Sequence, residues 1–212
     1  MTTRRKIVYA GGIVILAGGG LAAWYARDTS AEESERLATL LDWKPGHVIA
    51  EIGAGKGEMT ISAAERVGAT GHVFSTELEP SRLEDIQRAA RQRRLTNVTV
   101  LKAGEADSNL PAACCDAIFM RDVYHHFAHP VVIDASLFKA LRAGGSLAVI
   151  DFQPRWWLSL IAPIKGAPKS HGGHGIPQQV LIQEVTAAGF QVSEVIEHWP
   201  GRGYCVVFRK RL

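Results

Sequence analysis

Short apolar runs alternate with amphipathic segments along most of the chain. The first run covers residues 48–52, breaks into a glycine-rich loop, and is followed by helix-forming residues from Glu58 onward. The same alternation recurs as far as Asp151. Strands that alternate with helices in this way indicate βαβ units and a parallel sheet. We therefore predict an α/β fold with a doubly wound sheet.

The pattern predicts seven strands and the helices between them. Strands are expected at residues 48–52, 72–76, 97–101, 116–120, 146–151, 190–198 and 204–209, and helices at 58–67, 80–94, 130–141 and 177–188. The glycine turn at residues 201–203 joins the last two strands, which is typical of an antiparallel hairpin at a sheet edge. A further helix through Arg36 and Leu41, with Ser30 as its N-cap, is expected before the first strand.

The N-terminal residues carry a different pattern. Residues 7–26 contain no charged side chain, and a helix of that length spans the roughly 30 Å hydrocarbon core of a bilayer. Basic residues 4–6 precede the stretch and aromatic residues 24–25 stand at its far end, where interfacial aromatics belong. We predict one transmembrane helix that anchors the chain through residues 1–28, followed by one domain over residues 29–212. A cleaved secretory signal and a buried helix are the alternatives.

Composition changes this picture little. The chain has 212 residues, which is enough for one α/β domain with its own core. The formal net charge is only +3, so no nucleic-acid partner is expected. The three cysteines, Cys114, Cys115 and Cys205, form neither a disulfide framework nor a CxxC metal pair.

The loop after the first strand has the chemistry of a nucleotide-cofactor site. Gly53, Gly55 and Gly57 stand at every second position, whereas the dinucleotide fingerprint is GxGxxG. Glu51 stands two residues before the first glycine. A carboxylate there repels a pyrophosphate but pairs well with an ammonium group. The spacing therefore disfavours an NAD-type oxidoreductase, which stays the weaker alternative.

Two more acids follow the next two strands. Glu77 ends the second strand at a spacing suited to ribose hydroxyls, and Glu105 follows the third strand, where an adenine amino group can donate to it. Together with Glu51 they describe an adenosine that carries a positive amino acid and no phosphate. S-adenosylmethionine, with S-adenosylhomocysteine as its product, fits this description. Each acid also has a structural alternative, as a loop acceptor or a helix cap.

The chain resembles class I S-adenosylmethionine-dependent methyltransferases, and within that class it is similar to the ubiquinone/menaquinone-biosynthesis type. The resemblance rests on the segments EIGAGKG, VFSTE, AGEAD, CDAIFMRDVYHHF and LRAGGSLAVID, in that order. The chain departs from the family pattern at Ala143, where proline is usual, and at Glu105, where aspartate is commoner. The resemblance implies a seven-stranded Rossmann-like methyltransferase sheet with an antiparallel last strand.

The resemblance also implies a set of cofactor-binding residues. They are Glu51, Gly53, Ala54, Gly55, Gly57, Glu77, Leu78, Gly104, Glu105, Ala106, Arg121 and Asp122. In the family the first of these hold the methionine end, Glu77 the ribose, and Glu105 with Ala106 the adenine. Arg121 is expected near the sulfonium.

Candidates for the chemistry follow the fourth strand. Methyl transfer from a sulfonium is an in-line displacement, so the enzyme mainly positions the acceptor, and a base is needed only if the acceptor loses a proton. Tyr124, His125 and His126 are the catalytic candidates, and a histidine titrates near neutral pH. The alternative is that one histidine of the pair has only a structural role in the core.

Residues 153–177 form a long segment after the fifth strand, where ligands enter such sheets. Its apolar side chains are Trp156, Trp157, Leu158, Leu160 and Ile161. The segment can lie at a membrane surface, close over an apolar acceptor, or simply cover the core. His171 and His174 have no acid or cysteine close by in sequence, so we expect no metal site and interpret them as lid histidines that contact the substrate.

The sequence as a whole predicts a membrane-anchored methyltransferase that acts on a small-molecule or lipid-like acceptor. A non-catalytic S-adenosylmethionine-binding scaffold is the alternative from another class. The charges flanking residues 7–26 favour an N-terminus in the cytoplasm and a domain on the opposite side of the membrane. A cytosolic cofactor favours a cytoplasmic domain, which we expect. The acceptor atom and the oligomeric state are not predicted.

Overall fold

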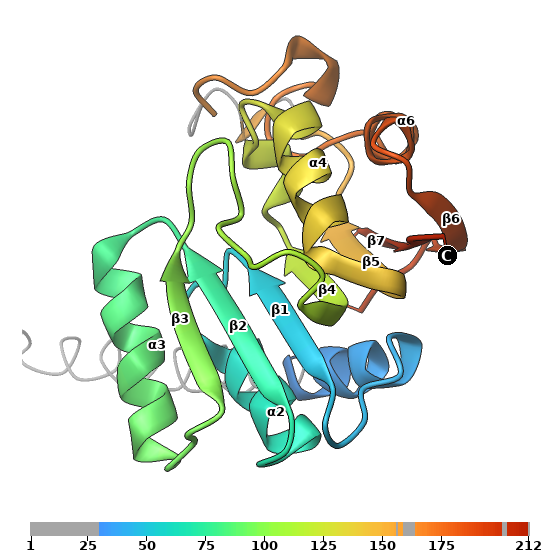
Figure 1. The fold of residues 1–212 in the computed structure, drawn as a ribbon. Helices are drawn as coiled ribbons and strands as arrows, with labels where there is room; N and C mark the ends of the chain where they lie inside the picture. The colour runs from blue at the N-terminus through green and yellow to red at the C-terminus, as the bar shows by residue number, and fades with distance from the viewer. Residues whose placement is uncertain (1–29, 156, 159–163, 201–202, 212) are drawn as a thin grey trace, which may run out of the picture.

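A mixed seven-stranded sheet forms the centre of the computed structural model, which describes residues 30–155, 157–158, 164–200 and 203–211 (Figure 1). Its strands are β1 (Val48–Ile52), β2 (His72–Glu77), β3 (Val98–Lys102), β4 (Cys115–Arg121), β5 (Leu141–Asp151), β6 (Gln191–Ile196) and β7 (Tyr204–Arg209). The order across the sheet is β3-β2-β1-β4-β5-β7-β6. Strands β1 to β5 pair in parallel, and β7 runs antiparallel to both β5 and β6. The predicted α/β sheet with a reversed last strand is confirmed.

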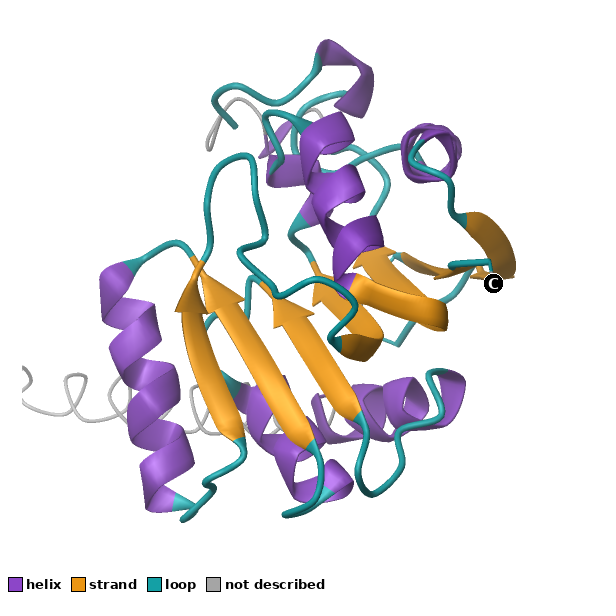
Figure 2. Ribbon diagram, in the orientation of Figure 1, coloured by secondary structure: helices purple, strands orange, loops and turns teal. Residues whose placement is uncertain are grey.

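Helices cover both faces of this sheet (Figure 2). They are α2 (Glu58–Val67), α3 (Pro80–Gln92), α4 (Pro130–Ala140) and α6 (Gln178–Ala187), with two short 3-10 turns, η1 (Tyr124–His126) and η2 (Lys169–His171). A further helix, over residues 30–40, precedes β1. All of these helices except the 3-10 turns fall where the apolar pattern predicted a helix.

Alternate residues along each strand build two separate cores. Ala50 and Ile52 of β1 face α4 and α6, whereas Ile49 faces the helix over residues 30–40 and α2. The side-chain period of a strand is two, so one short apolar run supplies both cores. A sheet buried on both faces needs such nearly continuous apolar strands, which is why β1, β4 and β5 were easy to predict.

The strand order reverses between β1 and β4, and the candidate site lies at this point of the sheet. β1 pairs with β2 on one side and with β4 on the other. The chain leaves β1 toward α2 and leaves β4 toward η1. A crevice therefore opens at the carboxyl ends of these two strands, which is where open α/β sheets bind ligands.

The start of β5 differs from the prediction. The strand was expected to begin at residue 146, after a helix that ends at residue 141, yet β5 already begins at Leu141. Its pairing with β4 is irregular between Cys115 and Ala117. A Cβ on Gly145 would lie 3.0 Å from the backbone oxygen of Asp116. Gly145 therefore allows two strands to approach closely. Glycine is typical both of such close contacts and of turns, so the sequence alone does not separate them.

The predicted anchor over residues 7–26 lies outside the described residues. Within the part of the chain that the structure describes, no helix is both long and apolar enough to cross a bilayer. Trp156 and residues 159–163 of the predicted lid also lie outside it.

Candidate active site

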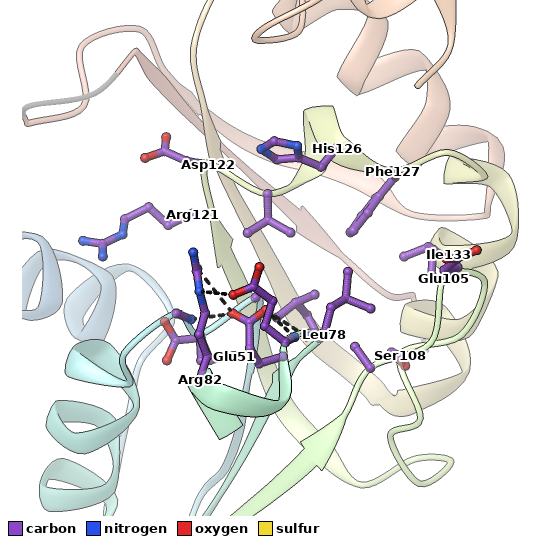
Figure 3. A pocket seen from close by; sticks show the side chains of 18 of the residues that line it. Glu51, Leu78, Arg82, Glu105, Ser108, Arg121, Asp122, His126, Phe127 and Ile133 are labelled. Atoms are coloured by element: carbon purple, nitrogen blue, oxygen red, sulfur yellow. Dashed lines mark hydrogen bonds and ion pairs between the residues drawn. The ribbon is translucent and has the colours of Figure 1, made fainter. Parts of the chain in front are cut away.

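A cavity of about 1070 Å³ opens at the carboxyl ends of β1, β2 and β4. The residues around it form two groups that face each other (Figure 3). The glycine loop, the acids that end the strands and Arg82 line one side. His126, Phe127 and Ile133 lie on the other side (Figure 3), and Ile164, Lys165, Gly166 and His174 also line the cavity.

The glycine loop passes tightly under the cavity. The backbone N–H groups of Gly53 and Ala54 both donate to the carbonyl of Thr76, at 2.9 and 3.0 Å. Gly53 has a φ of 68°, and a Cβ there would lie 2.4 Å from a methyl carbon of Val123. Only glycine satisfies both conditions, because a side chain would be strained and would also collide. The loop ends at Gly57, which is the N-cap of α2 and provides no side-chain cap.

Glu51 lines the cavity, and its side chain is almost completely buried. The residue is 3% exposed and accepts a hydrogen bond of 2.5 Å from the hydroxyl of Thr60, which in turn contacts Ser75. Burial raises the pKa of Glu51 to about 7, while the Thr60 hydrogen bond and the charge of Arg121 act in the opposite direction. A cationic ligand group beside Glu51 would favour its ionised form.

Glu77 holds the loop from the end of β2. One carboxylate oxygen accepts a hydrogen bond from the backbone N–H of Gly55, and the other accepts one from that of Leu78, each at 2.8 Å. Arg82 lies 3.9 Å from the same carboxylate. The oxygen hydrogen-bonded to Leu78 also accepts a longer hydrogen bond, of 3.5 Å, from the backbone N–H of Glu79. Because a carboxylate oxygen has two lone pairs, the oxygen hydrogen-bonded to Gly55 can still accept a hydrogen bond from a ligand hydroxyl.

The predicted adenine region is more open. Leu78 is 52% exposed and lines the cavity together with Gly104 and the exposed Glu105. Ala106, which the sequence also placed here, does not line the cavity, whereas Asp107 and Ser108 do. Asp107 accepts hydrogen bonds from the backbone of Asn109 and the hydroxyl of Ser136, so its carboxylate shapes the loop after β3.

Arg121 and Asp122 reach the cavity from the end of β4, as predicted. Arg121 donates to the carboxylate of Glu33 at 2.7 Å, and its side chain is 20% exposed. Burial lowers the pKa of Arg121, but the carboxylates around it outweigh this effect and raise the pKa overall. Asp122 has a φ of 56°, a left-handed conformation that aspartate tolerates better than most residues.

Only one of the three catalytic candidates lines the cavity. Tyr124 is buried in the core and donates to Asp134 at 2.8 Å. His125 is also buried, with its Nδ1 2.9 Å from a carboxylate oxygen of Asp151. His126 alone lines the cavity wall, beside Phe127 (Figure 3). These positions give Tyr124 and His125 structural roles behind the wall and leave His126 as the candidate base.

The surroundings of His126 keep its imidazole neutral, although the lowered pKa also makes it a weaker base. Partial burial, and then the neighbouring imidazoles of His125 and His174, lower its pKa to about 4. The ring centroids of His126 and His125 are 4.2 Å apart, and those of His126 and His174 are 5.9 Å apart. The imidazole is therefore neutral at physiological pH. Among the described residues no group of histidine, cysteine and acidic side chains has the arrangement of a metal site.

The residues present fit S-adenosylmethionine. A buried acid suits its ammonium group, a second acid suits its ribose, and the glycine loop lets the ligand approach the backbone. A family model described as a methyltransferase domain matches residues 44–188. The chain belongs to this methyltransferase domain family. This agrees with the resemblance of its sequence motifs to class I S-adenosylmethionine-dependent methyltransferases.

Individual relatives agree with this assignment. The methyltransferase is 32% identical to nocamycin O-methyltransferase of Saccharothrix syringae over 116 residues, which is 55% of this chain and 41% of that protein. It is 25% identical to the ubiquinone/menaquinone biosynthesis C-methyltransferase UbiE of Cupriavidus taiwanensis over 116 residues, which is 53% of this chain and 46% of that protein. The chain thus spans less than half the length of these two relatives.

The fold of the methyltransferase also matches solved structures. An S-adenosylmethionine-dependent methyltransferase from Aquifex aeolicus superimposes with a TM-score of 0.67 at 22% identity, covering 83% of this chain and 87% of that one. At this identity the likeness shows the fold alone.

Besides lining residues such as Arg82 and Ser108, sequence reasoning missed Glu33, which does not line the cavity but pairs with Arg121 of the lining. We interpreted it only as one of the charges that flank the apolar stretch. Glu33 stands four residues before Leu37 and eight before Leu41, so it lies on the buried face of its helix. The sequence did contain one indication of its role, because a single acid among the apolar positions of a helix face must be buried with a partner.

Proposed function

We propose that the methyltransferase transfers the methyl group of S-adenosylmethionine to a small, largely apolar acceptor. The observation that carries this proposal is the division of one cavity into two chemically different sides. The acids Glu51 and Glu77 stand on the cofactor side. Phe127 and Ile133 stand on the other with His126 (Figure 3), and Ile164 also lines the cavity. An apolar ligand would lie against these side chains and present its reacting atom to the cofactor.

The position of His126 supports an acceptor that loses a proton. A hydroxyl or an acidic carbon becomes a better nucleophile when its proton is withdrawn as the methyl group transfers. The neutral imidazole of His126 can take that proton at the cavity wall. Lys165 also lines this side and offers a positive charge to an acceptor that becomes anionic.

The relatives favour the same class of acceptor. One relative is named for O-methylation of nocamycin and another for C-methylation in ubiquinone and menaquinone biosynthesis. Both names refer to small molecules. We therefore place the acceptor among small organic compounds with an oxygen or an activated carbon as the methylated atom.

A membrane location is a separate part of the proposal. We propose that residues 1–28 anchor the methyltransferase, that residues 29–212 form its domain, and that this domain faces the cytoplasm. Trp157 is 47% exposed in the lid, and Val131, in the first turn of α4, is 69% exposed. Exposed apolar side chains suit contact with a lipid phase that delivers the acceptor.

The test is methyl transfer by the purified full-length chain, with methyl-labelled S-adenosylmethionine and extracts separated into lipid and aqueous fractions. We expect a labelled product in the lipid fraction that is absent with Glu51→Gln. Label in the aqueous fraction alone would overturn the membrane part and keep methyl transfer. Tight binding of S-adenosylhomocysteine without a labelled product in either fraction would favour a non-catalytic binding protein.

A further inference from the structure

Glu33 ties the helix over residues 30–40 to the cavity. It is 1% exposed, and its carboxylate accepts a hydrogen bond of 2.7 Å from Arg121 and one of 2.9 Å from the indole N–H of Trp199. The three residues come from the helix before β1, the end of β4 and the segment before β7. A carboxylate buried this deeply is costly unless it is paired, and Arg121 supplies the pairing charge.

Arg121 in turn stands beside the predicted ammonium site. Glu51 belongs to β1 and Arg121 to the neighbouring parallel strand β4, and both line the cavity. The charge of Arg121 acts on Glu51, and the charges of Glu33, Glu51 and Asp122 act on Arg121. An acid and a guanidinium that line the same cavity match the ammonium and carboxylate groups of a free amino acid.

We propose that Glu33 is a positioning residue for cofactor binding: it holds Arg121 as the partner of the carboxylate group at the cofactor's amino-acid end. This inference rests on the proposed use of S-adenosylmethionine. Arg121 can serve the ligand only while another carboxylate holds it away from Glu51. Without Glu33, the guanidinium would be drawn to Glu51, the group that the ammonium needs. The helix before β1 thereby becomes part of the binding site.

The test compares two ligands that differ only at the amino-acid end. S-adenosylhomocysteine carries the amino acid, whereas 5′-methylthioadenosine has the same adenosine and sulfur without it. Calorimetry on the full-length chain measures both affinities for the wild type and for Glu33→Gln. We expect the variant to bind S-adenosylhomocysteine about tenfold or more weakly, in line with the loss of a hydrogen bond to a charged group. Its affinity for 5′-methylthioadenosine should change by less than about twofold.

Glu35→Gln is the matched control. Glu35 lies on the same helix and pairs with Arg66 at 2.7 Å, but both side chains are exposed and neither lines the cavity. Its substitution should leave both affinities unchanged. Equal weakening of both ligands by Glu33→Gln would show a merely structural role and overturn the inference, as would unchanged binding of S-adenosylhomocysteine. If the wild type binds neither ligand, the proposed function itself fails.

A second variant keeps the test decisive if Glu33→Gln does not fold. Trp199→Phe removes the indole N–H that holds Glu33 and keeps the charge pair with Arg121. We expect a smaller loss of affinity with the same selectivity for S-adenosylhomocysteine. An unselective loss, or no loss, would contradict the inference.

Discussion

Glu77 accepts a hydrogen bond from the backbone N–H of Gly55 at 2.8 Å, although the two residues lie 22 positions apart in the chain. Glu77, which is predicted to bind the ribose hydroxyls, thus also fixes the middle of the glycine loop. Binding and loop structure are therefore coupled at one carboxylate, and a substitution there tests both.

Glu77→Gln and Glu77→Ala should separate these two roles. Glutamine has one acceptor oxygen in place of two, so it keeps the hydrogen bond from only one of Gly55 and Leu78, and it loses the charge. We expect a modest loss of stability and clearly weaker binding of S-adenosylhomocysteine. Alanine leaves the loop N–H groups without their partner, so it should also cost about 1–3 kcal/mol of unfolding free energy. Denaturant unfolding and calorimetry measure the two effects. Unchanged affinity in both variants would refute the ribose assignment.

Gly53→Ala should abolish cofactor binding because of a clash inside the site. The new Cβ would lie 2.4 Å from Val123 on the cavity wall, at a φ of 68°. Gly68→Ala is the control, since Gly68 has a φ of 67° but no atom within 4 Å of the position that its new methyl group would take. Each variant should lose about 1–2 kcal/mol from the backbone strain, and Gly53→Ala should lose more. Only Gly53→Ala should fail to bind S-adenosylhomocysteine.

The parts of the site that could be predicted depend on local sequence. Glu51 and Glu77 stand where apolar strands end, and the carboxyl ends of parallel strands meet at one edge of a sheet. The three glycines mark positive φ angles between a strand and a helix. Such features lie within a few residues of each other, so the pattern alone placed them correctly.

The parts that could not be predicted depend on distant contacts. Arg121 and Glu33 are 88 positions apart, and no hydrophobic periodicity in the sequence predicts their pairing. The two adjacent histidines share one 3-10 turn, and the pattern could not tell that His125 points to Asp151 while His126 lines the cavity. Tertiary packing decides both cases, and the sequence left the roles of the two histidines open for that reason.

Asp134→Asn should flatten the pH dependence of stability. The single hydroxyl hydrogen of Tyr124 faces the carboxyl groups of both Asp134 and Glu184, so one of the two acids must carry a proton for both contacts to be hydrogen bonds. Burial raises the pKa of Asp134 to about 7, from 3.8 for an exposed aspartate. The folded state then binds more protons than the unfolded state between these values, and stability falls as pH rises through them.

Asparagine resembles the protonated aspartate, so the variant should keep its stability up to pH 8 where the wild type loses on the order of a few kcal/mol. Urea titrations at pH 5, 6.5 and 8 measure this difference. Asp134→Ala is the control, because it removes the hydrogen bond and should destabilise the fold at every pH. The same slope in wild type and Asp134→Asn would show that another group titrates.

His126→Gln should reduce turnover and leave cofactor affinity intact. If the acceptor loses a proton, removal of the base lowers kcat by about 10²–10⁴-fold. His129→Gln is the control, since His129 is an exposed residue just before α4 and does not line the cavity. The measurement is methyl transfer to the acceptor identified from extracts, together with calorimetry of S-adenosylhomocysteine. Normal turnover in His126→Gln would show that the acceptor needs no base at this position.

The affinity for S-adenosylhomocysteine should rise with pH because of Glu51. In the ligand-free protein, burial raises the pKa of this carboxyl to about 7, so much of it is protonated below neutral pH. An ammonium group pairs with the ionised form, and binding must then release a proton when the pH is below about 7. The affinity should increase from pH 5 to pH 7.5, and calorimetry in two buffers of different ionisation enthalpy should detect the released proton. Glu51→Gln should bind weakly and without this pH dependence, since its amide does not titrate. An affinity that is constant or falls over this range in the wild type would remove Glu51 as the ammonium partner.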